Sequence, residues 1–179
     1  MSKYLFTSER LGFRTWKDAD HSELSKINLD ENVMEFFPTR LTEEESAQFI
    51  FGQQMNFNES GYCYFAVEIL ESQDLIGFIG ISEQLWESDF TPATDIGWRL
   101  KATAHGNGYA TEGALRCLDY AFNELNLKEL IAVAPKVNTP SIKVMKKIGM
   151  KFIKEFNHPK LESDERLERC VLYKIENGK

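Results

Sequence analysis

The sequence has few cysteines, no long apolar run and no excess of basic residues. Cys63, Cys117 and Cys170 are scattered over 179 residues, which gives neither a disulfide framework nor the paired spacing of a metal site. No apolar run approaches the roughly 20 residues of a membrane span, and the first residues lack the apolar core of a secretion signal. We therefore expect a cytoplasmic protein with no metal and no membrane partner.

Positive charge is also scarce. Lysine and arginine number 21 against 28 aspartates and glutamates, so the net charge is −7. A nucleic-acid-binding protein needs a basic face that releases counterions from phosphates, and we therefore expect no nucleic-acid partner. An acidic surface tolerates a cationic partner such as an amine or a basic peptide, although moderate negative charge also simply keeps soluble proteins dispersed.

The chain does have enough apolar material for a folded core. Hydrophobic residues make up 42% of it and aromatic residues 12%, which excludes intrinsic disorder. The length suits one domain, and no linker or repeat divides it. We predict a single domain over residues 1–179, of α/β class (α+β type).

Hydrophobic periodicity, capping boxes and turn residues define the expected elements. Expected strands cover residues 4–16, 62–70, 75–85, 95–100, 130–134, 152–156 and 168–175, and helices begin near residues 18, 42, 111 and 138. Most of the strands follow one another through short turns. The sheet is therefore expected to be mixed and mostly antiparallel.

The stretch from residue 94 to residue 122 organises the rest of the chain. In its strand, Ile96, Trp98 and Leu100 alternate on one face. A turn of small residues follows at 105–110, and a helix with a buried apolar stripe comes next. A strand, a glycine turn and a helix in this order point free backbone N–H groups and a helix N-terminus at an anion. This stretch therefore predicts a phosphate-binding turn.

Three glycine patterns compete for this turn. A P-loop is excluded because no lysine follows Gly108. A dinucleotide fingerprint fits Gly106 and Gly108 but has Thr111 in place of its third glycine. The third pattern, [Q/R]-x-x-G-x-[G/A], holds the pyrophosphate of coenzyme A (CoA). Gly108 and Ala110 fit it, and His105 stands where glutamine or arginine is more usual.

Three motifs follow one another along the chain. They are Ser8-Glu9-Arg10-Leu11 with Arg14, then Asp95-Ile96-Gly97-Trp98 with Gly106-Asn107-Gly108-Tyr109-Ala110-Thr111-Glu112, and finally Asn138-x-x-Ser141 with Lys147-Ile148-Gly149-Met150. In this order the chain resembles, over nearly its full length, the GNAT superfamily of acyl-CoA N-acyltransferases. It looks closest to the RimJ/RimL-like branch of ribosomal-protein N-terminal acetyltransferases. The resemblance implies a six- to seven-stranded sheet, splayed at the central strand and flanked by about four helices.

The resemblance also implies acetyl-CoA as co-substrate. Its pyrophosphate would meet the backbone N–H groups at 106–111, and its pantetheine would lie along the strand at 95–100 like an added strand. Asn138 has helix capping as an alternative role. Lys143 and Lys146 are candidate phosphate contacts, with a solvated helix face as the alternative. The residues expected to bind CoA are Trp98, Arg99, Leu100, His105, Gly106, Asn107, Gly108, Tyr109, Ala110, Thr111, Asn138 and Ser141.

Acetyl transfer to an amine needs a neutral amine, a polarised thioester carbonyl and a stabilised thiolate. The resemblance implies that backbone N–H groups near residues 98–100 polarise the carbonyl. Ser141 is the candidate donor to the departing sulfur, and its alternative role is that of a helix-start residue.

The general base has four candidates. Asp95 stands where several family members carry a catalytic glutamate, and Glu83 is the second choice. His105 and His158 have the ordinary pKa best suited to the task. The alternatives are an arginine partner for Asp95, a solvent-facing Glu83, and histidines that merely line a turn or loop. An α-amino group titrates near about 7.7–8.0, so water can suffice for it, whereas a lysine near about 10.4 needs help.

We therefore predict an N-acetyltransferase, monomeric or homodimeric, that acts on a primary amine by direct attack in a ternary complex. A protein N-terminal α-amine is one acceptor, and a small amine such as an antibiotic, polyamine or amino acid is the alternative. A non-catalytic acyl-CoA-binding module is the remaining alternative. Loops near residues 32–40, 86–94 and 157–166 are expected to choose the acceptor.

Overall fold

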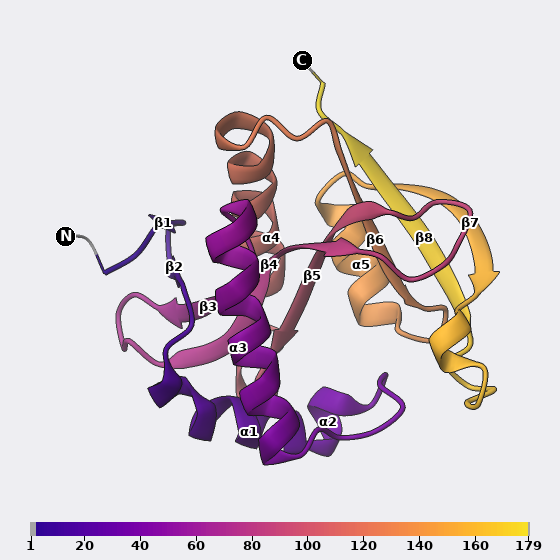
Figure 1. Ribbon diagram of the computed structural model, residues 1–179. Coiled ribbons are helices and arrows are strands. Elements are labelled where there is room, and N and C mark those ends of the chain that lie inside the picture. The colour runs from indigo at the N-terminus through magenta and orange to yellow at the C-terminus, as the bar shows by residue number, and fades with distance from the viewer. Residues whose placement is uncertain (1–2, 179) are drawn as a thin grey trace.

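The computed structural model describes residues 3–178, so Met1, Ser2 and Lys179 of the expected domain lie outside the described residues. Within this range the strands form one sheet in the order β1-β2-β3-β4-β5-β6-β8-β7. The strands are β1 (Phe6–Thr7), β2 (Leu11–Arg14), β3 (Tyr64–Ile69), β4 (Leu75–Gln84), β5 (Ala93–Leu100), β6 (Glu129–Pro135), β7 (Lys151–Asn157) and β8 (Arg169–Glu176). Figure 1 shows β1 and β2 at one side of the molecule and β7 and β8 at the other.

Helices connect these strands. The α-helices are α1 (His21–Leu29), α2 (Glu31–Met34), α3 (Glu43–Ser60), α4 (Tyr109–Asp119) and α5 (Thr139–Lys147). Short 3₁₀ turns are η1 (Asp18–Asp20), η2 (Ala102–Ala104) and η4 (Pro159–Leu161). The mixed α/β fold predicted from the sequence is confirmed, with eight strands and five α-helices in the described range.

The extra strand and helix have local causes. The first expected strand is divided by a turn in which the Ser8 N–H donates to the Leu11 carbonyl (2.9 Å) and Ser8 Oγ accepts from the Leu11 N–H (3.2 Å). This turn folds β1 back onto β2 as a hairpin. Asp30 ends α1 in an extended conformation, and its carboxylate caps α2 by accepting from the Asn32 N–H (2.9 Å).

The helix that follows the glycine turn is shorter than expected. It changes at residue 120 into a π-helical turn, η3 (Tyr120–Glu124), closed by the Leu125 N–H on the Tyr120 carbonyl (3.1 Å). The Tyr120 hydroxyl donates to the Gly61 carbonyl (3.1 Å), and its ring stacks on Phe6 (4.5 Å between centroids). These contacts come from distant segments, so periodicity in the helix itself gave no signal for the change.

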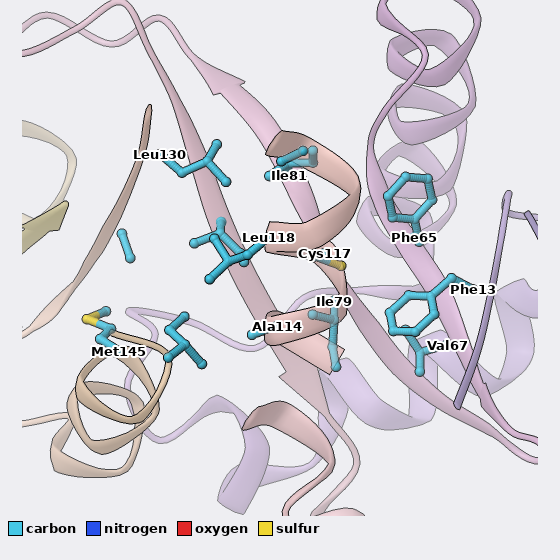
Figure 2. Packing of buried hydrophobic residues seen from close by; sticks show 14 of the residues in the cluster. Phe13, Phe65, Val67, Ile79, Ile81, Ala114, Cys117, Leu118, Leu130 and Met145 are labelled. Carbon is cyan, nitrogen blue, oxygen red and sulfur yellow. The ribbon is translucent and has the colours of Figure 1, made fainter. Parts of the chain in front are cut away.

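Alternating side chains of the sheet face two hydrophobic clusters. Ile79 and Ile81 of β4 pack with the buried residues of α4, as Figure 2 shows. Phe78, the residue before Ile79 in β4, points to the other face and belongs to the cluster formed with α1 and α3. Burying one such side chain contributes about 1.5–3 kcal/mol. Helices on both faces therefore hold β4 and its neighbour β5 in place.

The sheet opens between β5 and β6. These parallel neighbours share a single paired position, Asp95 opposite Ile131, and part toward their carboxyl ends. All other neighbouring strands pair antiparallel. Helix α4 begins just after β5 and α5 just after β6. Both helix N-termini therefore lie at the opening, which is where open α/β sheets bind ligands.

The N-terminal hairpin clamps the start of α4. The Ser8 hydroxyl and the Arg10 backbone N–H both donate to Glu112 Oε1 (2.7 and 2.8 Å), and Arg10 Nε donates to Glu112 Oε2 (2.7 Å). Burial raises the pKa of Glu112, but these hydrogen bonds outweigh it and the pKa is lowered. The first and central motifs therefore form one unit that orients α4.

We predict that Glu112→Gln lowers the midpoint of thermal unfolding at pH 7 by about 2–4 °C, because about 1 kcal/mol of charge-assisted bonding is lost. The lowered pKa means that this stabilisation is present above the ordinary pKa of glutamate and is lost as pH falls through the folded value. Calorimetry at pH 7 and at pH 3 should show the difference only at pH 7. Glu162→Gln, in an exposed loop, is the control; an unchanged midpoint for Glu112→Gln would refute the clamp.

Candidate active site

A first pocket of about 480 Å³ opens where β5 and β6 part. The end of β5, the turn before α4, the start of α5 and the segment after α2 line it. Of the residues expected to bind CoA, all but Asn107 line this pocket: Trp98, Arg99, Leu100, His105, Gly106, Gly108, Tyr109, Ala110, Thr111, Asn138 and Ser141. The structure thus brings together residues that lie as far apart in sequence as Trp98 and Ser141.

The glycine turn leaves the first backbone donors of α4 open to a ligand. Gly108 is the N-cap residue, with φ of 81°, and gives no side-chain cap. The first N–H groups of a helix have no partner within the helix. Asn107 instead turns its amide back, donating to the carbonyls of Thr103 (3.4 Å) and His105 (3.1 Å). The turn therefore presents backbone donors at a helix N-terminus, which suits a phosphate.

Two lysines of α5 add positive charge to the first pocket. Lys143 and Lys147 line it, whereas Lys146 does not. Residues four apart share one face of a helix, so the spacing of Lys143 and Lys147 could have identified both. These cations and the two helix N-termini make this side of the pocket suitable for the phosphates of CoA.

Asn138 and Ser141 have separate tasks at the start of α5. The Asn138 side chain accepts from the Ser141 N–H (3.1 Å) and so caps the helix. Within residues 3–178 the Ser141 hydroxyl makes no hydrogen bond. Ser141 lines the first pocket. Because Asn138 supplies the cap, the hydroxyl of Ser141 is left to act on a ligand.

Arg99 points its guanidinium at α1 and at the segment after α2. Its Nη1 donates to Asn28 Oδ1 (2.7 Å), and its guanidinium lies 4.2 Å from the centroid of the Phe37 ring. Its Nε is buried without a partner among the described residues. Burial lowers the pKa of Arg99 to about 10, so the group stays charged at neutral pH. These contacts hold Phe37 in place, and they are not made with the glycine turn.

A second pocket of about 210 Å³ meets the first at Phe36 and Phe37, which line both. It lies over Asp95 and over the second half of β6. The three loops expected to choose the acceptor each contribute to its wall, through Phe36, Trp86 and His158 among others. Tyr64 and Gln84 also line it. Neither residue stands out in the sequence.

A chain of hydrogen bonds runs along the wall of the second pocket to Asp95. Trp86 Nε1 donates to Gln84 Oε1 (3.2 Å), Gln84 Nε2 donates to the Tyr64 oxygen (3.2 Å), and the Tyr64 hydroxyl donates to Asp95 Oδ1 (2.7 Å). Gly97 makes room for the Tyr64 ring, because a Cβ there would lie 3.1 Å from it. Asp95 has no ion pair within residues 3–178, so the arginine partner considered above is not formed.

Asp95 has the electrostatics of a proton acceptor near neutral pH. Burial raises its pKa to about 7, against the opposing hydrogen bonds from Tyr64 and Gln84. Burial, together with the charge of Asp95, raises the pKa of Tyr64 well above its ordinary value. Tyr64 therefore keeps its proton and acts as a hydrogen-bond donor, while Asp95 exchanges a proton between pH 6 and pH 8.

The other base candidates lie in less suitable places. Glu83 is exposed and lines neither pocket. His105 lines the first pocket, with Nε2 at 2.8 Å from the Leu100 carbonyl oxygen. His158 lines the second pocket, but its Nδ1 accepts from the Lys160 N–H (3.1 Å), and burial lowers its pKa. Among the four, Asp95 combines a place in the second pocket with a pKa near 7.

No group of three or more histidine, cysteine or acidic side chains that could hold a metal occurs in the described part of the chain. All three cysteines are buried and unpaired. Burial raises the pKa of both Cys63 and Cys170 to about 12, so neither is a reactive thiolate. No helix among residues 3–178 has both the length and the apolar character needed to cross a membrane.

Comparisons with known proteins identify the family of this chain. The family model described as acetyltransferase (GNAT) domain matches residues 10–151. The chain is 32% identical over 145 residues to YnaD, an uncharacterised N-acetyltransferase of Bacillus subtilis (strain 168), with 81% of each chain covered. It superimposes on a GNAT-family acetyltransferase of Bacillus anthracis with a TM-score of 0.80 and 28% identity, over 97% of this chain and 98% of the other.

A third similar structure contains CoA. It is RimL, a ribosomal-protein α-N-acetyltransferase in complex with coenzyme A, with a TM-score of 0.78 over 96% of this chain and 97% of the other. At 13% identity this likeness shows the fold alone. The family match, the relative above 30% identity and the shared fold agree, and the chain belongs to the GNAT family of acetyl-CoA-dependent N-acetyltransferases.

Proposed function

We propose that this enzyme transfers the acetyl group of acetyl-CoA directly to a small primary amine, with Asp95 as the general base. The observation that carries the proposal is the meeting of two pockets at Phe36 and Phe37. The first suits CoA, and the second contains a carboxylate whose pKa is near 7. Acetyl-CoA supplies an acetyl group activated as a thioester, and both reactants are held at once in a ternary complex.

Asp95 takes the proton that the amine must lose. The amine nitrogen bonds to the acetyl carbon, the carbon–sulfur bond breaks, and its electron pair leaves with the sulfur. A base whose pKa lies near the working pH is the most effective for such a transfer, contributing about 10²–10⁴ in rate. Tyr64 fixes the orientation of the Asp95 carboxylate through its hydrogen bond of 2.7 Å. The proton then passes to solvent.

Two further groups support the charge that develops on the thioester. Past Asp95, the edge of β5 facing β6 has no paired strand, so backbone N–H groups near residues 98–100 are free for the carbonyl and the pantetheine. The Ser141 hydroxyl lines the same pocket and is the proposed donor to the departing thiolate. Both donors belong to rigid elements, which reduces the reorganisation needed during transfer.

The size of the second pocket favours a small amine as acceptor. Its volume of about 210 Å³ lies below the roughly 300–1,000 Å³ of pockets that hold drug-sized ligands. A protein N-terminal α-amine is the second candidate, supported by the motifs of the RimJ/RimL-like branch and by the fold shared with RimL. Three buried, unpaired cysteines fit a cytoplasmic location.

We predict that acetyl-CoA at a hundredfold excess over its Kd stabilises the wild type by about 2.7 kcal/mol. Gly108→Ala should weaken the binding of acetyl-CoA at least about fivefold. Alanine at this positive φ is strained by about 1–2 kcal/mol, and a backbone change that relieves the strain turns the first N–H donors of α4 away from the ligand. Thermal unfolding with and without acetyl-CoA measures the stabilisation, and calorimetric titration measures the affinity. Gly52→Ala, in α3 with open space around it, should leave the affinity unchanged; equal affinities for all three proteins would refute the assigned turn.

We predict that Asp95→Asn lowers kcat/KM by about 10²–10⁴-fold at pH 7.5 and removes the rise in rate centred near pH 7. Asparagine keeps an acceptor for the Tyr64 hydroxyl, so the pocket should persist and acetyl-CoA should bind as before. A pH–rate profile with free CoA as the readout tests this. Glu83→Gln is the matched variant and should keep the wild-type profile; if it loses the rise and Asp95→Asn does not, Glu83 is the base.

We predict that Ser141→Ala reduces kcat about 10- to 100-fold, since a hydrogen bond to a charged group contributes about 1.5–3 kcal/mol. The affinity for acetyl-CoA and the thermal midpoint should change little, because Asn138 caps α5 through the backbone N–H of residue 141. Thr139→Ala removes a nearby exposed hydroxyl outside the pocket and serves as control. An unchanged kcat would assign Ser141 no part in the reaction.

A further inference from the structure

The second pocket is lined mainly by apolar and aromatic side chains, with Asp95 as its one carboxylate. Four aromatic rings line it, those of Phe36, Phe37, Tyr64 and Trp86. The second half of β6 adds valine, alanine and proline side chains. The volume of about 210 Å³ is somewhat larger than the roughly 150 Å³ of an engineered protein cavity that binds benzene. A body the size of one aromatic ring matches this space.

The aromatic wall is held in a fixed position. Trp86 lies 4.4 Å from the His158 ring and 6.0 Å from the Phe156 ring, with which it is stacked. The neighbouring Phe90 packs edge-on against both Trp86 and Phe156. An ion pair between Lys154 and Asp89 joins the same loop to β7. The loop that carries Trp86 is therefore pinned at several points, and a preorganised wall costs less to order on binding.

The charges around the second pocket distinguish cations from anions. Asp95 is the carboxylate on its wall, and neither lysine nor arginine lines it. His158 also lines it, and its lowered pKa keeps it neutral at pH 7. Aromatic faces attract an ammonium group, whereas a carboxylate in this apolar space would lie beside Asp95 with no cation to offset it.

We propose, on the basis of the function proposed above, that the acceptor is a small primary amine with an uncharged, apolar body the size of one aromatic ring. The body lies against Trp86 and the two phenylalanines, and the amine faces Asp95. Trp86 acts as a specificity residue. Free amino acids and other acids of the same shape are rejected by charge.

The inference is tested by comparing kcat/KM for four acceptors with acetyl-CoA at saturation, each calculated on the concentration of the neutral amine because the four amines differ in basicity. Phenethylamine should exceed ethylamine by about 10- to 100-fold, because the ring fills the pocket. Phenylalaninamide should exceed phenylalanine by at least about tenfold, because these two differ in charge but not in the ring. Trp86→Ala should remove most of the preference for phenethylamine over ethylamine, and Trp86→Phe should restore part of it. Leu85→Ala, at an adjacent exposed residue (72% exposed) outside the pocket, should retain the preference.

Several results would overturn the inference. One is a kcat/KM for phenylalanine equal to or higher than that for phenylalaninamide. This result would mean that the carboxylate of phenylalanine binds Arg99, which lies behind Phe37. A second is a wild type that uses phenethylamine and ethylamine with equal kcat/KM. A third is a Trp86→Ala variant that loses kcat/KM equally for all acceptors, with Trp86→Phe showing the same loss. Turnover of an N-terminal peptide with none of the small amines would overturn the acceptor class while leaving the transferase activity intact. No turnover of any amine, despite acetyl-CoA binding by calorimetry, would instead refute the proposed function on which the inference rests.

Discussion

The structure depends on one incomplete strand pairing. β5 and β6 meet at Asp95 and Ile131 and then part, although unpaired backbone groups away from water normally cost free energy. Both strands lead into helices whose N-termini lie at the opening. Free backbone donors and two helix dipoles therefore converge on one space, which a ligand carrying amides and phosphates can satisfy. The opening explains why the pocket for CoA lies between elements that are otherwise tightly packed.

Asp95 stands at the last paired position before the strands separate, and its burial has opposite consequences for stability and for chemistry. Its folded pKa of about 7 lies above the ordinary value for an aspartate. A raised pKa means that its contribution to stability is present below the ordinary value and is lost as pH rises through about 7. The ionised carboxylate is thus least favourable in the folded protein at the pH where the proposed mechanism uses it as a base. Hydrogen bonds from Tyr64 and Gln84 limit this cost.

The sequence predicted most of the first pocket and little of the second. The turn at Gly106 and Gly108 is set by local backbone conformation, so a short motif suffices to identify it. The chain of hydrogen bonds that leads to Asp95 could not be predicted from a short motif. Its members Tyr64, Gln84 and Trp86 come from β3, β4 and a loop and meet through tertiary packing. The same reason applies to the clamp on α4 by the N-terminal hairpin. Its residues were visible as a motif, but their contact over about 100 positions was not.

In the proposed mechanism, the chain of hydrogen bonds from Trp86 to Asp95 also links acceptor choice to proton transfer. Trp86 forms part of the acceptor wall and donates to Gln84, Gln84 donates to Tyr64, and the Tyr64 hydroxyl donates to the base. Removing the first donor frees Gln84 to rotate, and the hydrogen bonds that oppose the raised pKa of Asp95 then weaken. A substitution at Trp86 therefore affects every acceptor through the base, and the difference between acceptors reports the wall alone. The side chains of Phe36 and Phe37 make no hydrogen bond to Trp86, Gln84, Tyr64 or Asp95. Substitutions at these two wall residues can therefore change the shape of the acceptor that fits without changing the proposed base.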